Sequence, residues 1–236
     1  MSENQRQENS EKLGAVYIDG FNLYHPIHDS GQNYLKWSNL WKLGEILCQS
    51  EGVKLEKVVF CTAVPKHYPD SFARHQKFNA AQISYGVEVL KGHHVPDDGG
   101  YSEKQSDINV ALSLIIDGLA GVYHTAFLIS ADSDQVATAR FFKQLLTPKG
   151  KTMVAAIPFG QTFPSDFTGL GVKRFDITIA QIDECLMPEE VQGKVGIIRR
   201  PVEYAPPPGY VYFDDRPTGK PPKAPKKSAW GVATKA

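Results

Sequence analysis

The sequence contains few cysteines and no long apolar run. Three of its 236 residues are cysteine, and Cys48, Cys61 and Cys185 stand far apart in apolar surroundings. No Cys or His spacing matches a zinc site, so we expect reduced core thiols and a cytoplasmic protein. No apolar stretch approaches the roughly 18 residues of a membrane-spanning helix, and we therefore expect no contact with a membrane.

The first twelve residues lack an apolar segment. The stretch MSENQRQENSEK is polar and without periodicity. We therefore expect residues 1–12 to be disordered and not to act as a secretory signal.

Common nucleotide and hydrolase motifs are also missing. The chain has no G-x-x-x-x-G-K-[ST] run, no G-x-G-x-x-G after its first apolar segment and no G-x-S-x-G elbow. These absences argue against a P-loop enzyme, a dinucleotide-binding fold and a serine hydrolase of the elbow type.

Charge and proline are distributed unevenly, although the formal net charge is zero. Residues 216–236 contain six of the 26 Lys and Arg residues and no acid, which leaves 20 basic against 26 acidic residues before them. Eight of the 16 prolines lie in 201–236. We therefore expect one domain over 13–199 and an extended, mostly unpacked tail over 200–236 that contacts nucleic acid or a protein, or only aids solubility. Within this tail, 211–213 could dock on the domain.

Short apolar runs alternate with helical patterns. The predicted strands are 14–18, 57–63, 87–90, 126–129 and 151–157. The predicted helices are 38–49 with Ser38 as cap, 69–84, 106–119 with Ser106 as cap, one ending near 146 and one ending near 187. Long loops are expected at 20–36, 92–103 and 158–172. This alternation predicts an α/β fold with a parallel sheet covered by helices on both faces.

The helix over 106–119 has the clearest periodicity. Its apolar residues recur at the spacing of one helical face, and we predict that this face is buried. The residues of the predicted buried face are Ile108, Ala111, Leu112, Ile115, Ile116 and Leu119.

Acidic residues follow the predicted strands. Asp19 ends the first strand, and Asp132 and Asp134 come directly after the strand at 126–129. Asp107 begins a helix, and helix starts lie at the same edge of a parallel sheet as strand ends. We therefore expect four carboxylates in one crevice, with Asn22 beside them.

Such a group of acids needs a counter-ion. Like charges a few ångströms apart do not all stay ionised without one, and Mg²⁺ or Mn²⁺ prefers carboxylate oxygens and water. Each acid also has a simpler explanation: a turn for Asp19, a favourable first-turn charge for Asp107 and a helix cap for Asp132 or Asp134. The convergence of all four favours the metal site.

Several blocks of the sequence resemble a known family. The blocks are Asp19-Gly-Phe-Asn22-Leu-Tyr, Lys36-Trp37, Phe60-Cys-Thr-Ala63, Arg74-His-Gln76, Lys104-Gln-Ser-Asp107 and Ile129-Ser-Ala-Asp132-Ser-Asp134. In order and spacing they are similar to NYN domains, in the LabA-like branch of the PIN-like nuclease superfamily. The resemblance covers about residues 14–183. Two departures stand out, because the family commonly has glycine where this chain has Gln105 and Ala131.

The resemblance implies a PIN-like three-layer α/β/α sandwich and a metal-dependent endoribonuclease. The implied metal ligands are Asp19, Asp107, Asp132 and Asp134, with Asn22 as a further catalytic residue and Mg²⁺ or Mn²⁺ as cofactor. Candidate phosphate contacts are Lys104, Arg74 and Lys77, and candidate base-stacking residues are Tyr24 and His25.

Two other functions stay open at this point. The same crevice and basic tail would suit a non-catalytic RNA-binding or regulatory module. Long loops closing over the crevice would suit a hydrolase of small phosphorylated molecules. The number of metal ions and self-association of the chain are also left open.

Overall fold

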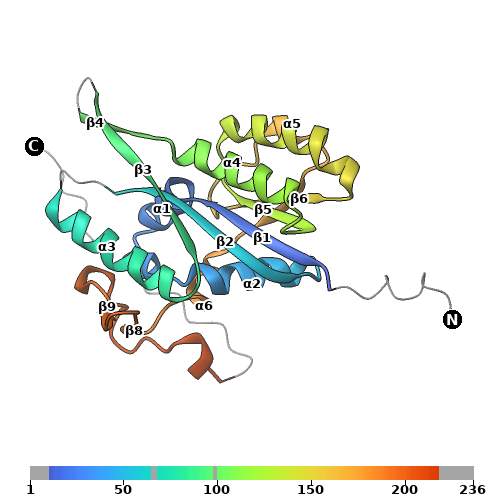
Figure 1. Ribbon diagram of the computed structural model, residues 1–236. Helices are drawn as coiled ribbons and strands as arrows, with labels where there is room; N and C mark the ends of the chain where they lie inside the picture. Colours follow the sequence, from blue (N-terminus) through green and yellow to red (C-terminus); the bar gives the residue numbers. More distant parts are fainter. Residues whose placement is uncertain (1–10, 65–67, 98–99, 218–236) are drawn as a thin grey trace, which may run out of the picture.

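Seven strands form one twisted sheet in the order β4-β3-β2-β1-β5-β6-β7 (Figure 1). The computed structural model describes residues 11–64, 68–97 and 100–217, and for 93–97 and 100–104 the description covers the backbone alone. The strands are β1 (Leu13–Asp19), β2 (Lys54–Ala63), β3 (Glu88–Asp97), β4 (Gly100–Lys104), β5 (Thr125–Ile129), β6 (Thr152–Ile157) and β7 (Lys173–Asp176). Only β3 and β4 pair antiparallel; the other neighbours in the sheet pair in parallel. The predicted mostly parallel α/β sheet is confirmed.

Helices cover both faces of this sheet. They are α1 (Gly20–Asp29), α2 (Leu40–Ser50), α3 (Pro69–Ser84), α4 (Ser106–Leu119), α5 (Val136–Leu145) and α6 (Ile179–Glu184). Figure 1 shows α4 and α5 on one side of the sheet and α1, α2, α3 and α6 on the other. The predicted three-layer α/β/α sandwich is therefore confirmed.

The strand residues alternate between two cores. On β1, Val16 and Ile18 pack with α1 and α2, whereas Ala15 and Tyr17 pack with α4 and α5. All four are fully buried because the central strand is covered on both faces. This is why the strand reads as a continuous apolar run.

The chain order reverses direction between β1 and β5. From β1 the chain builds outward through β2 and β3, and after α4 it returns to the other side of β1 and continues through β5, β6 and β7. In an open parallel sheet the carboxyl ends of the strands at such a reversal leave a crevice between the flanking loops. Asp19 stands at the end of β1, and 130–134 follows β5 at this point.

The stretch predicted as a loop at 20–36 is largely helical. It contains α1 and the 3₁₀ helix η2 (Asn33–Trp37). Asp19 caps α1 by accepting from the amides of Phe21 and Asn22, and Leu23 and Ile27 are buried at helical spacing. The aromatic residues of this stretch obscured that pattern.

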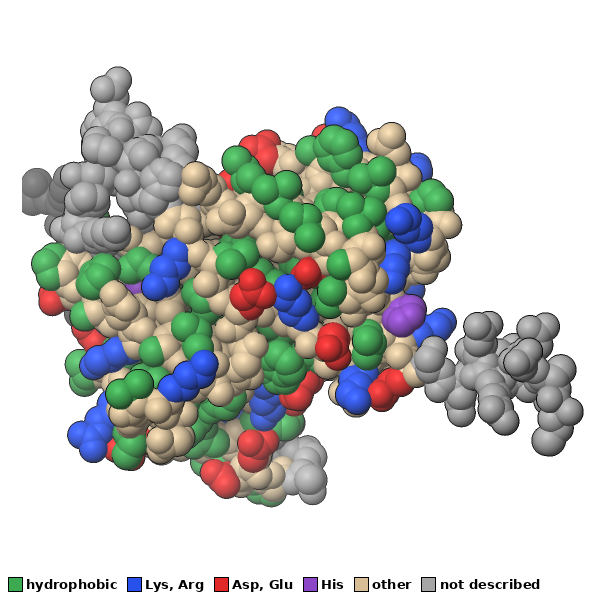
Figure 2. Space-filling view, in the orientation of Figure 1, with side chains coloured by type: hydrophobic (Ala, Val, Ile, Leu, Met, Phe, Trp, Pro, Cys, Tyr) green, Lys and Arg blue, Asp and Glu red, His purple; other side chains and the backbone are tan. Residues whose placement is uncertain are grey.

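The predicted buried face of the helix over 106–119 is wrong. Ile108, Leu112, Ile116 and Leu119 of α4 are 55, 54, 59 and 48% exposed, and Figure 2 shows hydrophobic side chains on the surface over α4 and α5. The buried residues are Ser106, Val110, Leu114 and Gly118. Apolar residues occupy both the inward face and the outward face of the helix, so periodicity alone could not choose between them.

Local packing decides which face of α4 turns inward. A Cβ on Gly118 would lie 2.5 Å from both Leu146 and the Tyr123 hydroxyl, so only glycine permits this approach. The Tyr123 hydroxyl also donates to the Leu114 carbonyl at 2.7 Å. These contacts fix the rotation of α4 and leave an apolar stripe outside.

Several element boundaries also differ from the predictions. Asn39, not Ser38, caps α2, and α4 begins after Gln105 without a side-chain cap. The predicted loop at 92–103 is the β3–β4 hairpin, and β7 precedes a shorter last helix, α6. The chain also contains the two-stranded sheet β8 (Glu190–Gln192) and β9 (Ile197–Arg199), and the 3₁₀ helices η3 (Ser133–Gln135), η4 (Thr147–Lys149), η5 (Ser165–Phe167), η6 (Val202–Tyr204) and η7 (Phe213–Asp215). The helix predicted over 69–84 is confirmed.

Residues 201–217, which we call the C-terminal segment, pack on the domain. Tyr204 is buried, and Tyr210 and Tyr212 join a cluster around Trp37 and Ala81. The predicted docking of 211–213 is confirmed, since Lys42 lies 5.4 Å from the ring centroid of Phe213. The expectation of an unpacked tail is wrong for this segment, while 218–236 and 1–10 lie outside the described residues.

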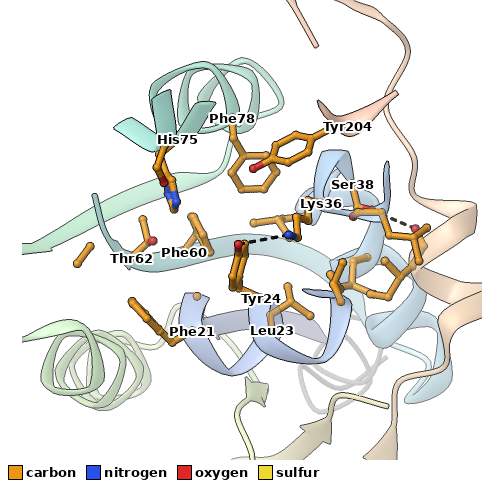
Figure 3. Close-up of a pocket in the computed structure, with 18 residues that line it drawn as sticks. Phe21, Leu23, Tyr24, Lys36, Ser38, Phe60, Thr62, His75, Phe78 and Tyr204 are labelled. Carbon is orange, nitrogen blue, oxygen red and sulfur yellow. Dashed lines mark hydrogen bonds between the residues drawn. The ribbon is translucent and has the colours of Figure 1, made fainter. Parts of the chain in front are cut away.

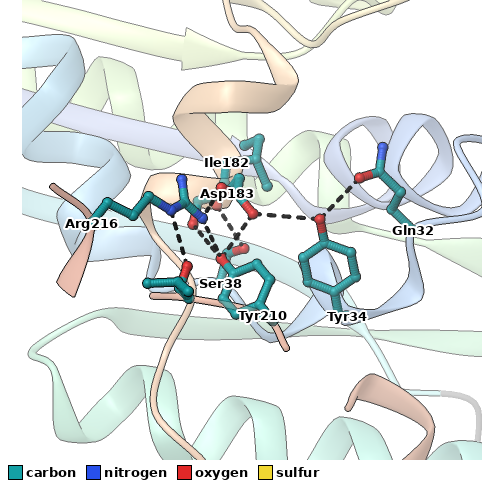
Figure 4. A network of polar contacts seen from close by, with 8 residues as sticks. Gln32, Tyr34, Ser38, Ile182, Asp183, Tyr210 and Arg216 are labelled. Atoms are coloured by element: carbon teal, nitrogen blue, oxygen red, sulfur yellow. Dashed lines mark hydrogen bonds and ion pairs between the residues drawn. The ribbon is translucent and has the colours of Figure 1, made fainter. Parts of the chain in front are cut away.

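A buried ion pair anchors this segment (Figure 4). The Arg216 guanidinium lies 2.6 Å from Oδ2 of Asp183 on α6, and both side chains are almost fully buried. The hydroxyls of Tyr210 and Tyr34 approach Oδ1 at 2.8 and 3.4 Å. Burial, reinforced by the Asp183 charge, raises the pKa of Tyr34 to about 12.

The predictions about the cysteines and about a membrane-spanning helix can be compared with the described residues. Cys48, Cys61 and Cys185 are buried and form no disulfide among the described residues, as expected. Among the helices of residues 11–217 that the structure describes, none combines the length and the apolar character needed to span a membrane.

Candidate functional site at the carboxyl edge of β1 and β5

Asp19 is the most buried of the predicted site acids. Its side chain ends β1 and is 5% exposed. Oδ1 accepts from the amides of Phe21 and Asn22 at 3.1 and 3.3 Å, and Oδ2 accepts from Nδ2 of Asn22 at 2.7 Å. The start of α1 therefore fixes this carboxylate in one orientation.

The pKa of Asp19 is raised above its ordinary value. Burial is the largest cause, hydrogen bonds from Asn22 and Phe21 act in the opposite direction, and the charge of Asp132 adds to the rise. Burial and a neighbouring like charge both disfavour the ionised form. A cation at this position would relieve both costs.

Glycine after Asp19 allows α1 to start tightly against β2. A Cβ on Gly20 would lie 2.7 Å from the carbonyl oxygen of Cys61 and 2.9 Å from the Phe60 ring. Any larger residue would push the helix start, and with it Asp19, away from β2.

Asn22 connects Asp19 to the loop after β5. Its Nδ2 donates to Asp19, and its Oδ1 accepts from the amide of Ala131 at 3.0 Å. Both ends of the amide are thus occupied by the protein. The geometry makes Asn22 a positioning residue that ties the two strand ends together.

Asp132 and Asp134 follow β5 in the short loop and helix η3. Asp132 is half-buried, and its Oδ1 accepts from the amide of Asp134 at 2.9 Å, so it caps η3. Asp132 therefore caps η3 and is also one of the predicted metal ligands. Asp134 is exposed at the rim.

Asp107 reaches the same region through its backbone. It is exposed in the first turn of α4, and its carbonyl accepts from Nε2 of the buried Gln135 at 3.2 Å. Sequence reasoning missed Gln135, because nothing in its local pattern marks a buried amide that joins two helix starts.

The residues just before Asp107 have two unusual features. Gln105 has a φ of 80°, the one positive value at a non-glycine position in the described chain. The hydroxyl of the buried Ser106 has no hydrogen-bond partner among the described residues. Strained backbone and unsatisfied buried groups are both concentrated at functional sites. We therefore include the start of α4 in the candidate site.

The four acids do not form one tight cluster. Among the described residues no group of three or more His, Cys, Asp or Glu is placed to hold a metal ion. Asn22 ties Asp19 to the amide of Ala131, next to Asp132, so these two acids form a neighbouring pair, and Asp107 and Asp134 are exposed.

This pair nevertheless fits a hydrated divalent cation. Mg²⁺ is usually held by one or two carboxylates together with water and substrate phosphate, and less often by a full protein cage. No ion pair among the described residues uses any of the predicted acids Asp19, Asp107, Asp132 and Asp134. The donor set therefore suits Mg²⁺ or Mn²⁺ without a competing protein cation.

The predicted phosphate contacts are distributed more widely. Arg74 on α3 is held 2.9 Å from Glu203 of the C-terminal segment and also bonds Tyr204. Lys77 is exposed on the same helix. The Lys104 side chain lies outside the described part of the structure.

A cavity of about 230 Å³ lies on the β2 side of α1 (Figure 3), and its lining includes Gly20 and Phe21, the two residues that follow Asp19. The predicted stacking residue Tyr24 lines it, whereas His25 is exposed and rests against the rings of Phe21 and Tyr24. Its lining comes from α1, η2, α2, β2, α3, α6 and the C-terminal segment. Sequence reasoning missed Thr62, His75 and Tyr204, since their contribution depends on the assembled fold.

Comparisons with known proteins support the fold alone. No family model and no curated protein matches the chain. A crystal structure of a protein of unknown function from Vibrio parahaemolyticus is similar, with a TM-score of 0.54 and 14% identity over 73% of this chain and 97% of that chain. The similarity supports the three-layer α/β/α fold and carries no functional assignment.

Proposed function

We propose that this chain is a metal-dependent endoribonuclease that hydrolyses RNA phosphodiester bonds at the carboxyl edge of β1 and β5. The observation that carries the proposal is that Asn22 ties buried Asp19 to the amide of Ala131, next to Asp132, at the point where the strand order reverses. Parallel sheets bind ligands at such a point. The resemblance to NYN domains supports RNA as the substrate.

The chain's own groups then have separate roles. Asp19 and Asp132 hold the cation, and Asn22 keeps Asp19 oriented through its two hydrogen bonds. A bound Mg²⁺ or Mn²⁺ would supply an activated water and offset charge on the phosphate oxygens. Asp107 and Asp134, exposed at the rim, orient waters around this pair or hold a second ion.

The test is cleavage of a labelled mixed-sequence RNA by wild-type protein and by Asp19→Asn, in Mn²⁺, in Mg²⁺ and in EDTA. We expect cleavage that requires the metal and falls by at least about 100-fold in the variant, because even residues that only support metal ligands commonly cost 10- to 100-fold. Asp166→Asn, at an exposed acid in η5, is the matched control.

The Asp19→Asn variant should remain folded, so lost activity can be assigned to the site. Asparagine also caps helices. Because the pKa of Asp19 is raised on folding, the ionised carboxylate costs stability at neutral pH, and this cost disappears as pH falls towards the ordinary carboxyl range. The side-chain NH2 of the variant would face Nδ2 of Asn22 and lose the hydrogen bond at 2.7 Å, which offsets the relief of the charge, so we expect an unfolding temperature close to that of wild type at pH 7.

The alternative is a non-catalytic RNA-binding or regulatory module. Titration of Mn²⁺ into the same samples separates the two functions. Metal binding and RNA binding without cleavage would favour the module; failure of wild-type protein to bind Mn²⁺, alone or with RNA, would contradict the metal site itself. Contacts of 218–236 with nucleic acid or a protein remain part of this proposal.

Self-association and a cytoplasmic location complete the proposal. The apolar stripe on α4 offers a surface for a second copy, and the only acids of that helix are Asp107 and Asp117. Asp117 is already paired with Lys57 at 2.8 Å, so packing two stripes together brings few like charges into contact. Sedimentation equilibrium measures this self-association directly, and a monomer at all concentrations would contradict it.

The cysteines bear on the proposed cytoplasmic location. Three buried cysteines that form no disulfide agree with a reducing compartment.

A further inference from the structure

We propose that the cavity between α1, β2 and α3 binds one nucleobase of an RNA strand whose neighbouring phosphate lies at Asp19. This inference rests on the proposed function, but it concerns a separate compartment with its own lining. It assigns to the chain a subsite that selects an unstacked base next to the acidic edge.

The cavity and the acidic edge share the start of α1. Gly20 and Phe21 line the cavity, and they directly follow Asp19 in the chain. On the neighbouring strand Asp19 pairs in register with Cys61, and the next two residues, Thr62 and Ala63, also line the cavity. A strand bound with its phosphate at Asp19 therefore has the cavity within reach of the attached base.

Aromatic rings form much of the cavity wall. Figure 3 shows Phe21 and Tyr24 on the α1 side and Phe60 and Phe78 on the opposite side, with Tyr204 at one end. Proteins that bind single-stranded RNA stack unpaired bases on such rings. An enclosed set of rings favours a flat heterocycle over a sugar or a phosphate.

Tyr24 is held in place before any ligand arrives. Its ring stacks on His28 at 5.7 Å between centroids, with 14° between the planes. Nζ of Lys36 lies 4.6 Å from the Tyr24 centroid and donates to its hydroxyl at 3.3 Å. A fixed ring loses little freedom on binding, which favours stacking affinity.

The polar groups of the cavity suit a base edge. Thr62, Ser71 and His75 contribute hydroxyl and imidazole groups to a lining that contains no aspartate or glutamate. Lys36 supplies the one lysine or arginine side chain in the lining. A few polar groups in an apolar pocket are typical of sites that orient a small neutral ligand.

The volume limits the occupant. Pockets for drug-sized ligands usually measure roughly 300–1,000 Å³. At about 230 Å³ this cavity is smaller, so we expect one ring system to enter while the sugar and phosphate stay outside.

Fluorescent base substitution tests the proposal without cleavage. A set of ten-nucleotide RNAs, each with 2-aminopurine at one position, is titrated with the full chain in Ca²⁺, which takes the same oxygen ligands as Mg²⁺ and keeps the phosphate site charged. We expect a strong fluorescence change at one or two adjacent positions only. An RNA that is abasic at the responsive position should bind at least about 5-fold more weakly, the lower end of the range for stacking of one base.

Two matched variants on α3 identify the cavity as the cause. Ser71→Phe places a ring into the cavity, whereas Ala73→Phe adds the same ring at an exposed position of the same helix. The first should abolish the position-specific signal and the penalty for the abasic RNA, and the second should keep both. Thermal unfolding verifies that both variants fold.

The outcomes separate this inference from the proposed nuclease. A position-specific signal that Ser71→Phe removes supports the base subsite even if no RNA is cut. Metal-dependent cleavage with equal fluorescence changes at all positions, or a specific signal that survives Ser71→Phe, overturns the subsite and leaves the nuclease standing. Absence of both cleavage and a specific signal overturns both.

Discussion

The start of α1 separates two unlike surfaces at the same edge of the sheet. On the β5 side the surface is polar, with Asp19 tied through Asn22 to the loop that contains Asp132. On the β2 side it is an aromatic cavity lined without any acid. One short helix would therefore hold the proposed cation and phosphate site beside the proposed base site, and both would depend on the close approach of Gly20 to β2.

The two surfaces also differ in how the chain builds them. The polar side comes from residues directly after β1 and β5 and from the start of α4. The cavity needs seven elements, including Tyr204 of the C-terminal segment. The polar side should therefore survive damage to the C-terminal segment, and the cavity should not.

Breaking the buried ion pair between Arg216 and Asp183 should damage the cavity but not the polar side. Of the changes predicted here, it should also have the largest effect on stability. Arg216→Met removes the partner of Asp183, whose charge would stay buried, and such changes commonly cost about 3–5 kcal/mol. Two tyrosine hydroxyls still approach Asp183, so we expect the lower end of that range. Urea unfolding gives the loss, and the 2-aminopurine signal should weaken while Mn²⁺ affinity stays unchanged.

Arg174→Met is the matched control. Arg174 pairs with Asp176 at 2.8 Å on the surface, where both side chains are more than half exposed, and exposed pairs contribute at most about 1 kcal/mol. Similar losses in the two variants would contradict the anchoring role of Arg216.

A smaller effect is expected when Asn22, which links the ends of β1 and β5, is replaced. Asn22→Ala removes a hydrogen bond that lowers the pKa of Asp19, so this pKa, already above its ordinary value, should rise further. Because the carboxylate form holds the cation, activity should be lost at higher pH on the acid side of the profile. At neutral pH we expect about a 10-fold loss, the lower end for residues that orient metal ligands.

The measurement is the pH dependence of the cleavage rate for wild type, Asn22→Ala and Asn33→Ala. Asn33 is an exposed asparagine at the start of η2, and its change should leave the profile as in wild type. An acid limb that stays in place in Asn22→Ala, with an unchanged rate, would show that Asp19 does not depend on Asn22.

The sequence revealed the polar side far better than the cavity. Apolar runs mark buried parallel strands, and an acid directly after such a run necessarily lies at the carboxyl edge, as Asp19 and Asp132 do. Local pattern could not supply the distances between these acids, so four were expected together, whereas no group of three or more acids, histidines or cysteines is placed to hold a metal among the described residues.

The errors arose where tertiary packing decides between equivalent local patterns. Both faces of α4 are apolar, and the contacts of Gly118 with Tyr123 and Leu146 select one of them. The composition of 201–217 suggested an unpacked tail, yet Tyr204 and Arg216 each find a partner that is remote in sequence. No local rule relates Tyr204 to α3 or Arg216 to α6.

The smallest predicted effect concerns the strained residue at the start of α4. Gln105 has a φ of 80°, a region that costs a side chain roughly 1–2 kcal/mol. Gln105→Gly should remove this strain, but it also loses the side chain's own interaction and frees the unfolded chain. We therefore expect a net gain of about 0.5 kcal/mol in urea unfolding, whereas Gln49→Gly, at an exposed position of α2, should cost about 1 kcal/mol. If both variants lose stability equally, the backbone at Gln105 is not strained; if only Gln105→Gly gains stability while its cleavage rate falls, the strain holds Asp107 in place for the polar side of α1.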